Sequence, residues 1–156
     1  MLKSLLAPTL LAVFTSAAVM VPEPPPNWQV KNFNGLCARS GCSYDFDVSG
    51  PARGSIPSFM AHCSGEEKRT LQTFFAPCNV KAGGSGNIGV SAKYLPRKDV
   101  NTGIIDTIAV SLAFNDLATG TAGIFNNYTG TAPITMTQVV APLSFTITPV
   151  LNPYIN

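Results

Sequence analysis

The residues with the most obvious potential for chemistry are four cysteines, Cys37, Cys42, Cys63 and Cys78, and a single histidine. Four cysteines can pair completely in any of three connectivities. We favour the pairs Cys37–Cys42 and Cys63–Cys78, because the two cysteines of each pair lie on either side of a short segment between predicted strands. In the chain-entropy model each closure contributes on the order of 2–3 kcal/mol to the stability of the fold. Zinc sites with four cysteines use two closely spaced pairs, which this spacing does not provide, so we expect no metal.

The histidine, His62, precedes Cys63 directly. A Cys–His catalytic pair needs a free thiolate, and neighbouring residues of a strand point to opposite faces. We therefore interpret His62 as an ordinary, partly exposed histidine. The sequence also lacks a Gly-x-Ser-x-Gly nucleophile motif, a Gly-x-Gly-x-x-Gly motif after a strand and a phosphate-binding loop. These observations predict a protein without enzymatic activity and without a cofactor.

The acidic residues allow more than one interpretation. Asp45 and Asp47 lie two residues apart on one face of a predicted strand, which favours solvated outer-face residues, with a weak calcium site as the alternative. Glu66 and Glu67 belong to a charged turn at residues 65–69. Asp106 is surrounded by apolar residues of the same parity, which indicates a hydrogen-bonded position at a strand bend or, less favoured, a residue lining a pocket.

Strict alternation of apolar and polar residues is the main structural signal. It predicts strands at residues 43–49, 87–95, 104–114 and 143–148, with less regular strands at 28–33, 56–63, 71–75 and 134–140. Residues 87–95 and 104–114 form a predicted hairpin. Residues 35–41, 81–86 and 116–130 are predicted loops, the last with at most a short strand near Ile124 and Phe125. The chain is therefore expected to be an all-β, disulfide-stabilised β-sandwich or β-barrel of about eight to ten antiparallel strands.

The N-terminus has the three parts of a secretory signal peptide. Lys3 precedes a mainly apolar stretch at residues 5–14, and small residues follow at 15–18. The apolar stretch is shorter than the roughly 20 residues of a membrane-spanning helix. We therefore expect a signal peptide at 1–18, a proline-rich lead-in at 19–27 that cannot be helical, and a single β domain at 28–156. Export would place the cysteines where disulfides form, and the mature protein is expected to be extracellular.

Charge and composition exclude some partners. The chain carries ten basic and eight acidic residues, and cleavage would remove only Lys3. Without a basic field we expect no nucleic acid or membrane partner. The sequence Asn127-Tyr128-Thr129 is an N-glycosylation sequon, so Asn127 is a candidate modification site in the predicted loop. We interpret the only tryptophan, Trp28, as a core anchor rather than as a ligand-stacking residue.

Three segments resemble small secreted fungal proteins related to the Alternaria major allergen, a family that includes plant-defence elicitors and effector candidates. Residues 28–33 (WQVKNF) look like its first strand, residues 42–48 (CSYDFDV) like its second, and the Cys63–Cys78 spacing like its first structural disulfide. The resemblance covers residues 28–78 and rests downstream on strand pattern alone. It implies a single β-barrel or sandwich, no catalytic activity and a role between a fungus and its host.

The chain also departs from that family. Relatives carry a second disulfide in the C-terminal half, and the allergen has a further cysteine for dimerisation; this chain has neither and carries the pair Cys37–Cys42 instead. A covalent dimer is not implied, which leaves a monomer or non-covalent dimer, and no ligand residues can be transferred.

These features predict an effector-like or elicitor-like protein that recognises a host extracellular protein through its surface. The expected contact regions are residues 53–57, 66–69, 96–103 and 116–130. The alternative is a carbohydrate-binding or cell-wall-associated module, which would need exposed aromatic side chains on one face. Tyr94, Tyr128 and Tyr154 are the candidates for such a face.

Overall fold

The structure is a computed structural model of the 156-residue chain. It describes residues 24–68, 74–83, 88–96, 106–115, 125–134, 136 and 142–152. The predicted signal peptide (1–18), the first part of the lead-in and Tyr154 lie outside these residues. Most of the segments predicted at 71–75, 96–103, 116–130 and 134–140 also lie outside them.

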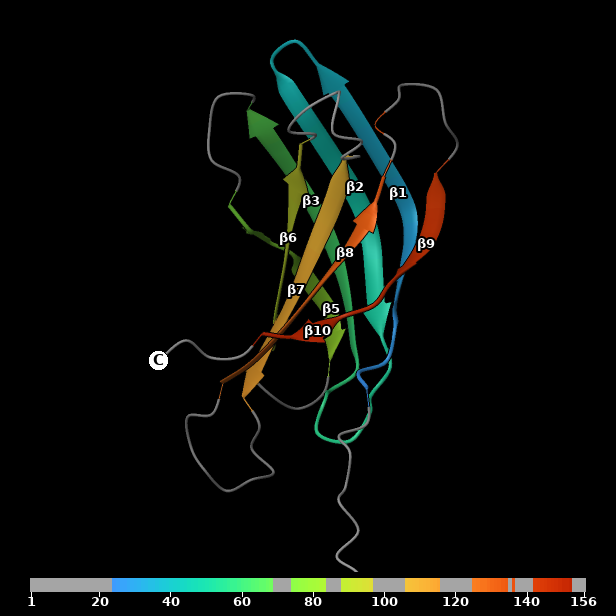
Figure 1. Cartoon of the computed structure of the whole chain (residues 1–156), viewed down its shortest axis with the longest axis vertical. Coiled ribbons are helices and arrows are strands. Elements are labelled where there is room, and N and C mark those ends of the chain that lie inside the picture. The colour runs from blue at the N-terminus through green and yellow to red at the C-terminus, as the bar shows by residue number, and fades with distance from the viewer. Residues whose placement is uncertain are drawn as a thin grey trace, which may run out of the picture.

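Ten antiparallel strands form two five-stranded sheets in the described part of the chain (Figure 1). The strands are β1 (Trp28–Ala38), β2 (Gly41–Gly50), β3 (Phe59–Lys68), β4 (Ala76–Pro77), β5 (Asn79–Gly83), β6 (Ile88–Leu95), β7 (Thr107–Asn115), β8 (Phe125–Pro133), β9 (Leu143–Ile147) and β10 (Val150–Leu151). The first sheet has the order β5-β3-β2-β1-β9, and the second has the order β10-β8-β7-β6-β4. The all-β prediction is therefore confirmed, and of the two predicted architectures the chain adopts the sandwich.

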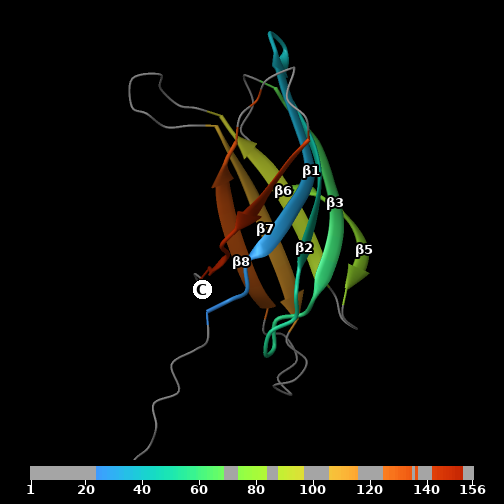
Figure 2. The ribbon, with the colours of Figure 1, turned by 90° about the vertical axis from the view of Figure 1, so that its right-hand side faces the viewer.

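The core lies between the sheets, as Figure 2 shows edge-on, and it contains the alternating apolar residues predicted from the sequence. On β6 every second residue from Val90 to Tyr94 is buried, whereas on β7 all residues from Ile108 to Leu112 are buried, and these two strands pair as the predicted hairpin. The core residues of β7 are Ile108, Val110, Leu112 and Phe114, so the residues between them point to the outer face. Trp28 is 1% exposed and packs edge-on against Phe59, which confirms its role as a core anchor.

The irregular alternation of β1 results from a β-bulge. The pairing of β1 with β2 shifts between Lys31 and Asn34, and Asn32 within the bulge has a φ of 56°. Asparagine tolerates this left-handed conformation better than most residues. Because of the bulge, Phe33 points into the core against Phe46 while Asn32 remains on the outer face.

The last residues of the proline-rich lead-in contact the β domain. Pro26 is buried, and the Arg53 guanidinium donates a hydrogen bond to the carbonyl oxygen of Pro24 at 2.9 Å. Residues just before Trp28, where the sequence placed the start of the domain, therefore also contact the domain.

Four predicted loops or turns are wrong in part. Strand β1 extends to Ala38 within the predicted 35–41 loop, and β3 continues through the charged residues Gly65–Lys68. Strand β5 includes residues 81–83, and β8 begins at Phe125 within the predicted 116–130 loop. In each case a neighbouring strand supplies regular backbone pairing; residues 65–68 pair with residues 41–44 of β2. Pairing of this kind outweighs the unfavourable local composition.

The Tyr44 ring packs so closely on Gly65 that only glycine fits at this position. A Cβ atom at this position would contact the Tyr44 side chain, whose hydroxyl is fixed by a hydrogen bond to the carbonyl oxygen of Ala92. We expect Gly65→Ala to lower the free energy of unfolding by about 1–3 kcal/mol, because the core must rearrange around the added methyl group. Gly89→Ala is the matched control, since a Cβ there meets nothing closer than 4.0 Å. Equal losses in the two variants, measured by urea unfolding, would contradict this explanation.

Candidate functional site

The tip of the β1–β2 hairpin projects beyond the rest of the sandwich in both views (Figures 1 and 2). The two strands pair in register up to Ala38 and Gly41, which leaves Arg39 and Ser40 as the turn. Arg39 is exposed, and Leu36 is one of the exposed large apolar residues. We refer to Leu36 to Ser43 as the hairpin tip.

A disulfide closes the hairpin tip across directly paired residues. Cys37 and Cys42 are register partners and are bonded to each other, and Cys63 is bonded to Cys78. The favoured pairing is therefore the one that forms. All four cysteines are consumed, so no thiol is available for a covalent dimer.

Two cavities flank the hairpin tip and share Ala38, Gly41 and Cys42 in their walls. The larger, of about 470 Å³, also involves Arg39, Tyr94 and Asp106. The smaller, of about 210 Å³, also involves Leu36, Glu66 and Glu67. The hairpin tip thus borders two cavities, and each cavity has at least one carboxylate in its wall.

Asp106 and Tyr94 form the floor of the larger cavity. The Tyr94 hydroxyl donates a 2.7 Å hydrogen bond to Asp106 Oδ1, and its oxygen lies 3.9 Å from Cys37 Sγ. Burial and the adjacent carboxylate raise the pKa of Tyr94 well above its usual range. Asp106 therefore has both predicted properties, because it is hydrogen-bonded just before β7 and also lines a cavity. Tyr94 is 4% exposed, so the expectation of an exposed aromatic there is wrong.

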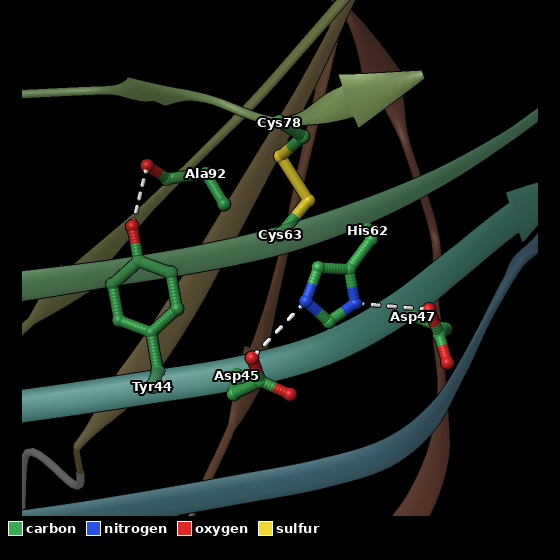
Figure 3. Close-up of a disulfide and its surroundings, with 7 residues drawn as sticks. All are labelled: Tyr44, Asp45, Asp47, His62, Cys63, Cys78 and Ala92. Carbon is green, nitrogen blue, oxygen red and sulfur yellow. Dashed lines mark hydrogen bonds and ion pairs between the residues drawn. A yellow bond between two sulfur atoms is a disulfide. The ribbon is translucent and has the colours of Figure 1, made fainter. Parts of the chain in front are cut away.

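Tyr44 connects the two sheets below the smaller cavity. Its hydroxyl donates a 2.9 Å hydrogen bond to the carbonyl oxygen of Ala92 across the core (Figure 3). Burial, and then the negative charge of Glu67, raise the pKa of Tyr44 to about 12. Burial also raises the pKa of Glu67, against the opposing effect of Lys93. The Glu67 carboxylate, which lines the smaller cavity, is thus partly shielded from solvent.

His62 lies on the outer face of the first sheet between two aspartates (Figure 3). Its Nε2 is 3.1 Å from Asp45 Oδ2, and its Nδ1 is 3.1 Å from Asp47 Oδ1. A neutral imidazole has one N–H, so both contacts are favourable together only when the ring is doubly protonated. Both ring nitrogens of this partly exposed histidine therefore face carboxylates of β2.

Asp47 is the centre of this cluster on the first sheet. It accepts hydrogen bonds from Lys81 at 3.0 Å and from Asn32 at 3.2 Å, in addition to its contact with His62. These three contacts, with Lys81 the largest, lower the pKa of Asp47 to about 2. Asp45 and Asp47 do lie on the outer face, but as partners of His62 rather than as isolated solvated residues.

The lowered pKa of Asp47 gives a pH-dependent contribution to stability. Its folded pKa lies below its ordinary value, so the contribution is complete above about pH 4 and is lost as the pH falls toward about 2. We expect Asp47→Asn to lower the free energy of unfolding by up to about 1 kcal/mol at neutral pH, because the contacts are solvent-exposed. The difference from the unsubstituted protein should vanish near pH 2, as measured by urea unfolding across this range.

Asp45→Asn is the matched control for this measurement. Asp45 contacts His62 from a side chain that is 57% exposed, so its substitution should have the smaller effect at neutral pH. A loss in Asp47→Asn that stays constant down to pH 2 would contradict the assignment.

The two disulfides should differ in stability and in reactivity. Cys63 is fully buried, whereas Cys37 and Cys42 are both partly exposed at the hairpin tip. From the loop lengths, removal of Cys37–Cys42 should cost about 2 kcal/mol and removal of Cys63–Cys78 about 3 kcal/mol. Paired Cys→Ser variants measure this by urea unfolding. Graded reduction with alkylation and peptide mapping should show Cys37 and Cys42 modified first, and the reverse order would contradict the structure.

The other predicted site residues are dispersed. Neither cavity at the hairpin tip includes His62 or Asp45, so Asp106 does not share a cavity with them. Among the described residues, no group of three or more histidine, cysteine or carboxylate side chains is placed to hold a metal ion. Within the same residues, no helix combines the length and hydrophobicity needed to cross a bilayer.

The predicted contact regions stay a prediction, but their local structure differs in part from the predicted loops. Residues 53–57 are mostly exposed, whereas Glu66, Glu67 and residues 125–130 belong to strands. Residues 35–41, predicted as a small loop, instead form the end of β1 and the turn of the hairpin tip. The signal that could have corrected this is the five-residue spacing of Cys37 and Cys42, which suits directly paired positions on either side of a short turn.

No family model, curated protein or solved structure matches this chain. The function must therefore be inferred from the geometry of the chain itself.

Proposed function

We propose that this chain is a secreted, non-catalytic recognition protein that binds another protein with its hairpin tip. The observation that carries the proposal is a projecting hairpin closed by a disulfide between directly paired residues. A segment that is ordered before binding loses little conformational entropy when it docks. The tip can therefore bind through few residues.

The chemistry of the hairpin tip suits a protein partner. Leu36 supplies exposed apolar surface and Arg39 a guanidinium group at the turn. Arginine is enriched among the residues that dominate protein interfaces, and a cavity on each side could receive partner side chains. Since Glu66, Glu67 and Asp106 line these cavities, basic side chains of the partner are the complementary occupants.

The proposed setting is the interface between a fungus and its host, and the proposed partner is a host extracellular protein. This part rests on the resemblance of residues 28–78 to secreted fungal effector-like and elicitor-like proteins. Two disulfides in a small β protein are consistent with an extracellular location.

Carbohydrate binding is less well supported by the side chains. Tyr94 is buried, and Tyr128 stacks on Phe114 with ring planes 3° apart. These two residues therefore do not form an exposed aromatic row.

The proposal is tested by capture from host extracellular fluid on immobilised mature protein. We expect Leu36→Ser combined with Arg39→Glu to lose the captured host protein, because both contacts of the tip are removed. The matched control is Met60→Ser combined with Lys31→Glu, which changes one exposed apolar and one exposed basic residue elsewhere on the first sheet. Equal capture by both double variants would refute recognition by the tip. Repeated absence of any captured host protein, or retention on chitin, glucan or cellulose instead, would refute protein recognition as a whole.

A further inference from the structure

The two outer faces of the sandwich differ in chemistry. The first sheet carries the charged cluster around His62. On the second sheet, the outward residues of the central strand β7 are Ala109, Ser111 and Ala113, which lie outside the core cluster although Ala109 and Ser111 are almost fully buried. Their outward neighbours on β6 and β8 include Gly89, Ser91, Thr129 and Thr131. Lys93 stands opposite Ala109 with its ammonium group over the Phe75 ring, so the small, uncharged and more exposed part of this face is the row of Gly89, Ala113 and Asn127.

Asn127, the acceptor residue of the sequon, lies on this second face. Strand β8 pairs residue by residue with β7, and Asn127 is opposite the outward residue Ala113. Its neighbour Tyr128 is opposite Leu112 and packs inward on Phe114. The sequon is thus in a strand and not in the predicted loop, but its asparagine points away from the core.

The contacts of Asn127 leave the glycosylation chemistry intact. The Ser111 hydroxyl donates a 2.7 Å hydrogen bond to Asn127 Oδ1, which fixes the orientation of the amide. The sugar is attached to the other amide atom, Nδ2. The hydrogen bond that orients the side chain can therefore persist after modification.

The surface beside Asn127 has room for a sugar ring. Gly89, Ala113 and Asn127 form one row across three strands. A Cβ atom added at Gly89 would meet nothing closer than the Ala113 carbonyl oxygen at 4.0 Å. Gly89 and Ala113 therefore present no large side chain beside Asn127.

We propose that Asn127 carries an N-linked oligosaccharide whose first N-acetylglucosamine lies along the Ala113–Gly89 row and covers the outer face of the second sheet. In the transfer step Nδ2 loses one proton and bonds to C1 of the sugar, and the lipid pyrophosphate that carried the oligosaccharide leaves. No oxidant or reductant is required.

This inference rests on the proposed secretion of the protein, and it also specifies which surfaces remain open. The hairpin tip and the charged face belong to the first sheet, on the opposite side of the sandwich. An oligosaccharide at Asn127 would leave both accessible while it excludes protein partners from the second sheet.

The first test is intact mass analysis of the full chain secreted from a eukaryotic host, before and after treatment with an N-glycosidase. We expect the treatment to remove the mass of one oligosaccharide. Asn127→Gln should lack that mass and Thr129→Ser should keep it, because serine preserves the sequon and the hydroxyl that accepts from Asn152. If Asn127→Gln fails to fold, Thr129→Ala removes the sequon while keeping the Asn127–Ser111 contact. Secreted protein without an oligosaccharide would overturn the proposal.

A heterologous leader separates this test from the proposed secretion. If the natural leader fails to export the chain but a heterologous leader yields glycosylated protein, the proposed export is wrong and the site at Asn127 is right. Covering of the second face is measured by acylation of Lys93, which borders that face on β6, against Lys81 near Asp47 on the first sheet. Removing the oligosaccharide should speed the labelling of Lys93 and leave Lys81 unchanged. Equal rates at Lys93 before and after removal would refute the covering.

Discussion

The two sheets are joined near one edge by a disulfide and two hydrogen bonds. Cys63 belongs to β3 of the first sheet, while Cys78 lies where the chain passes from β4 of the second sheet to β5 of the first. The Cys78 amide also donates to the Val90 carbonyl of β6, and Tyr44 bonds to Ala92 two residues further along β6. These contacts fix the spacing of the sheets, on which the packing of the core and the height of the hairpin tip depend.

The hairpin tip is held by the core below it. Strands β1 and β2 occupy inner positions of the first sheet, and their buried residues Val30, Phe46 and Val48 are almost fully enclosed. Toward the tip, β2 still pairs with β3 as far as Gly41, and Cys37–Cys42 packs against the core from a partly exposed position. The hairpin tip and the centre of the core thus belong to one continuous hairpin.

The strands that could be predicted are those in which apolar and polar residues alternate clearly. Residues 43–49, 87–95 and 143–148 alternate clearly and form β2, β6 and β9. Residues 65–68 and 125–130 are rich in glycine, charge or asparagine and become strands only because β2 and β7 pair with them. The favoured cysteine pairing followed from spacing, whereas the His62 cluster depends on strand register, which alternation within a single strand cannot supply.

The ends of the second sheet limit how this protein can associate. Its two outermost strands, β4 and β10, are each two residues long, so each presents few backbone donors and acceptors to an incoming chain. Long unpaired edges are the usual templates for strand addition and for edge-to-edge aggregation. Because β4 and β10 pair with only two residues each of β6 and β8, most of the outer edges of these two longer strands has no partner strand among the described residues. Association by strand addition at the second sheet would therefore engage β6 or β8 rather than the outermost strands.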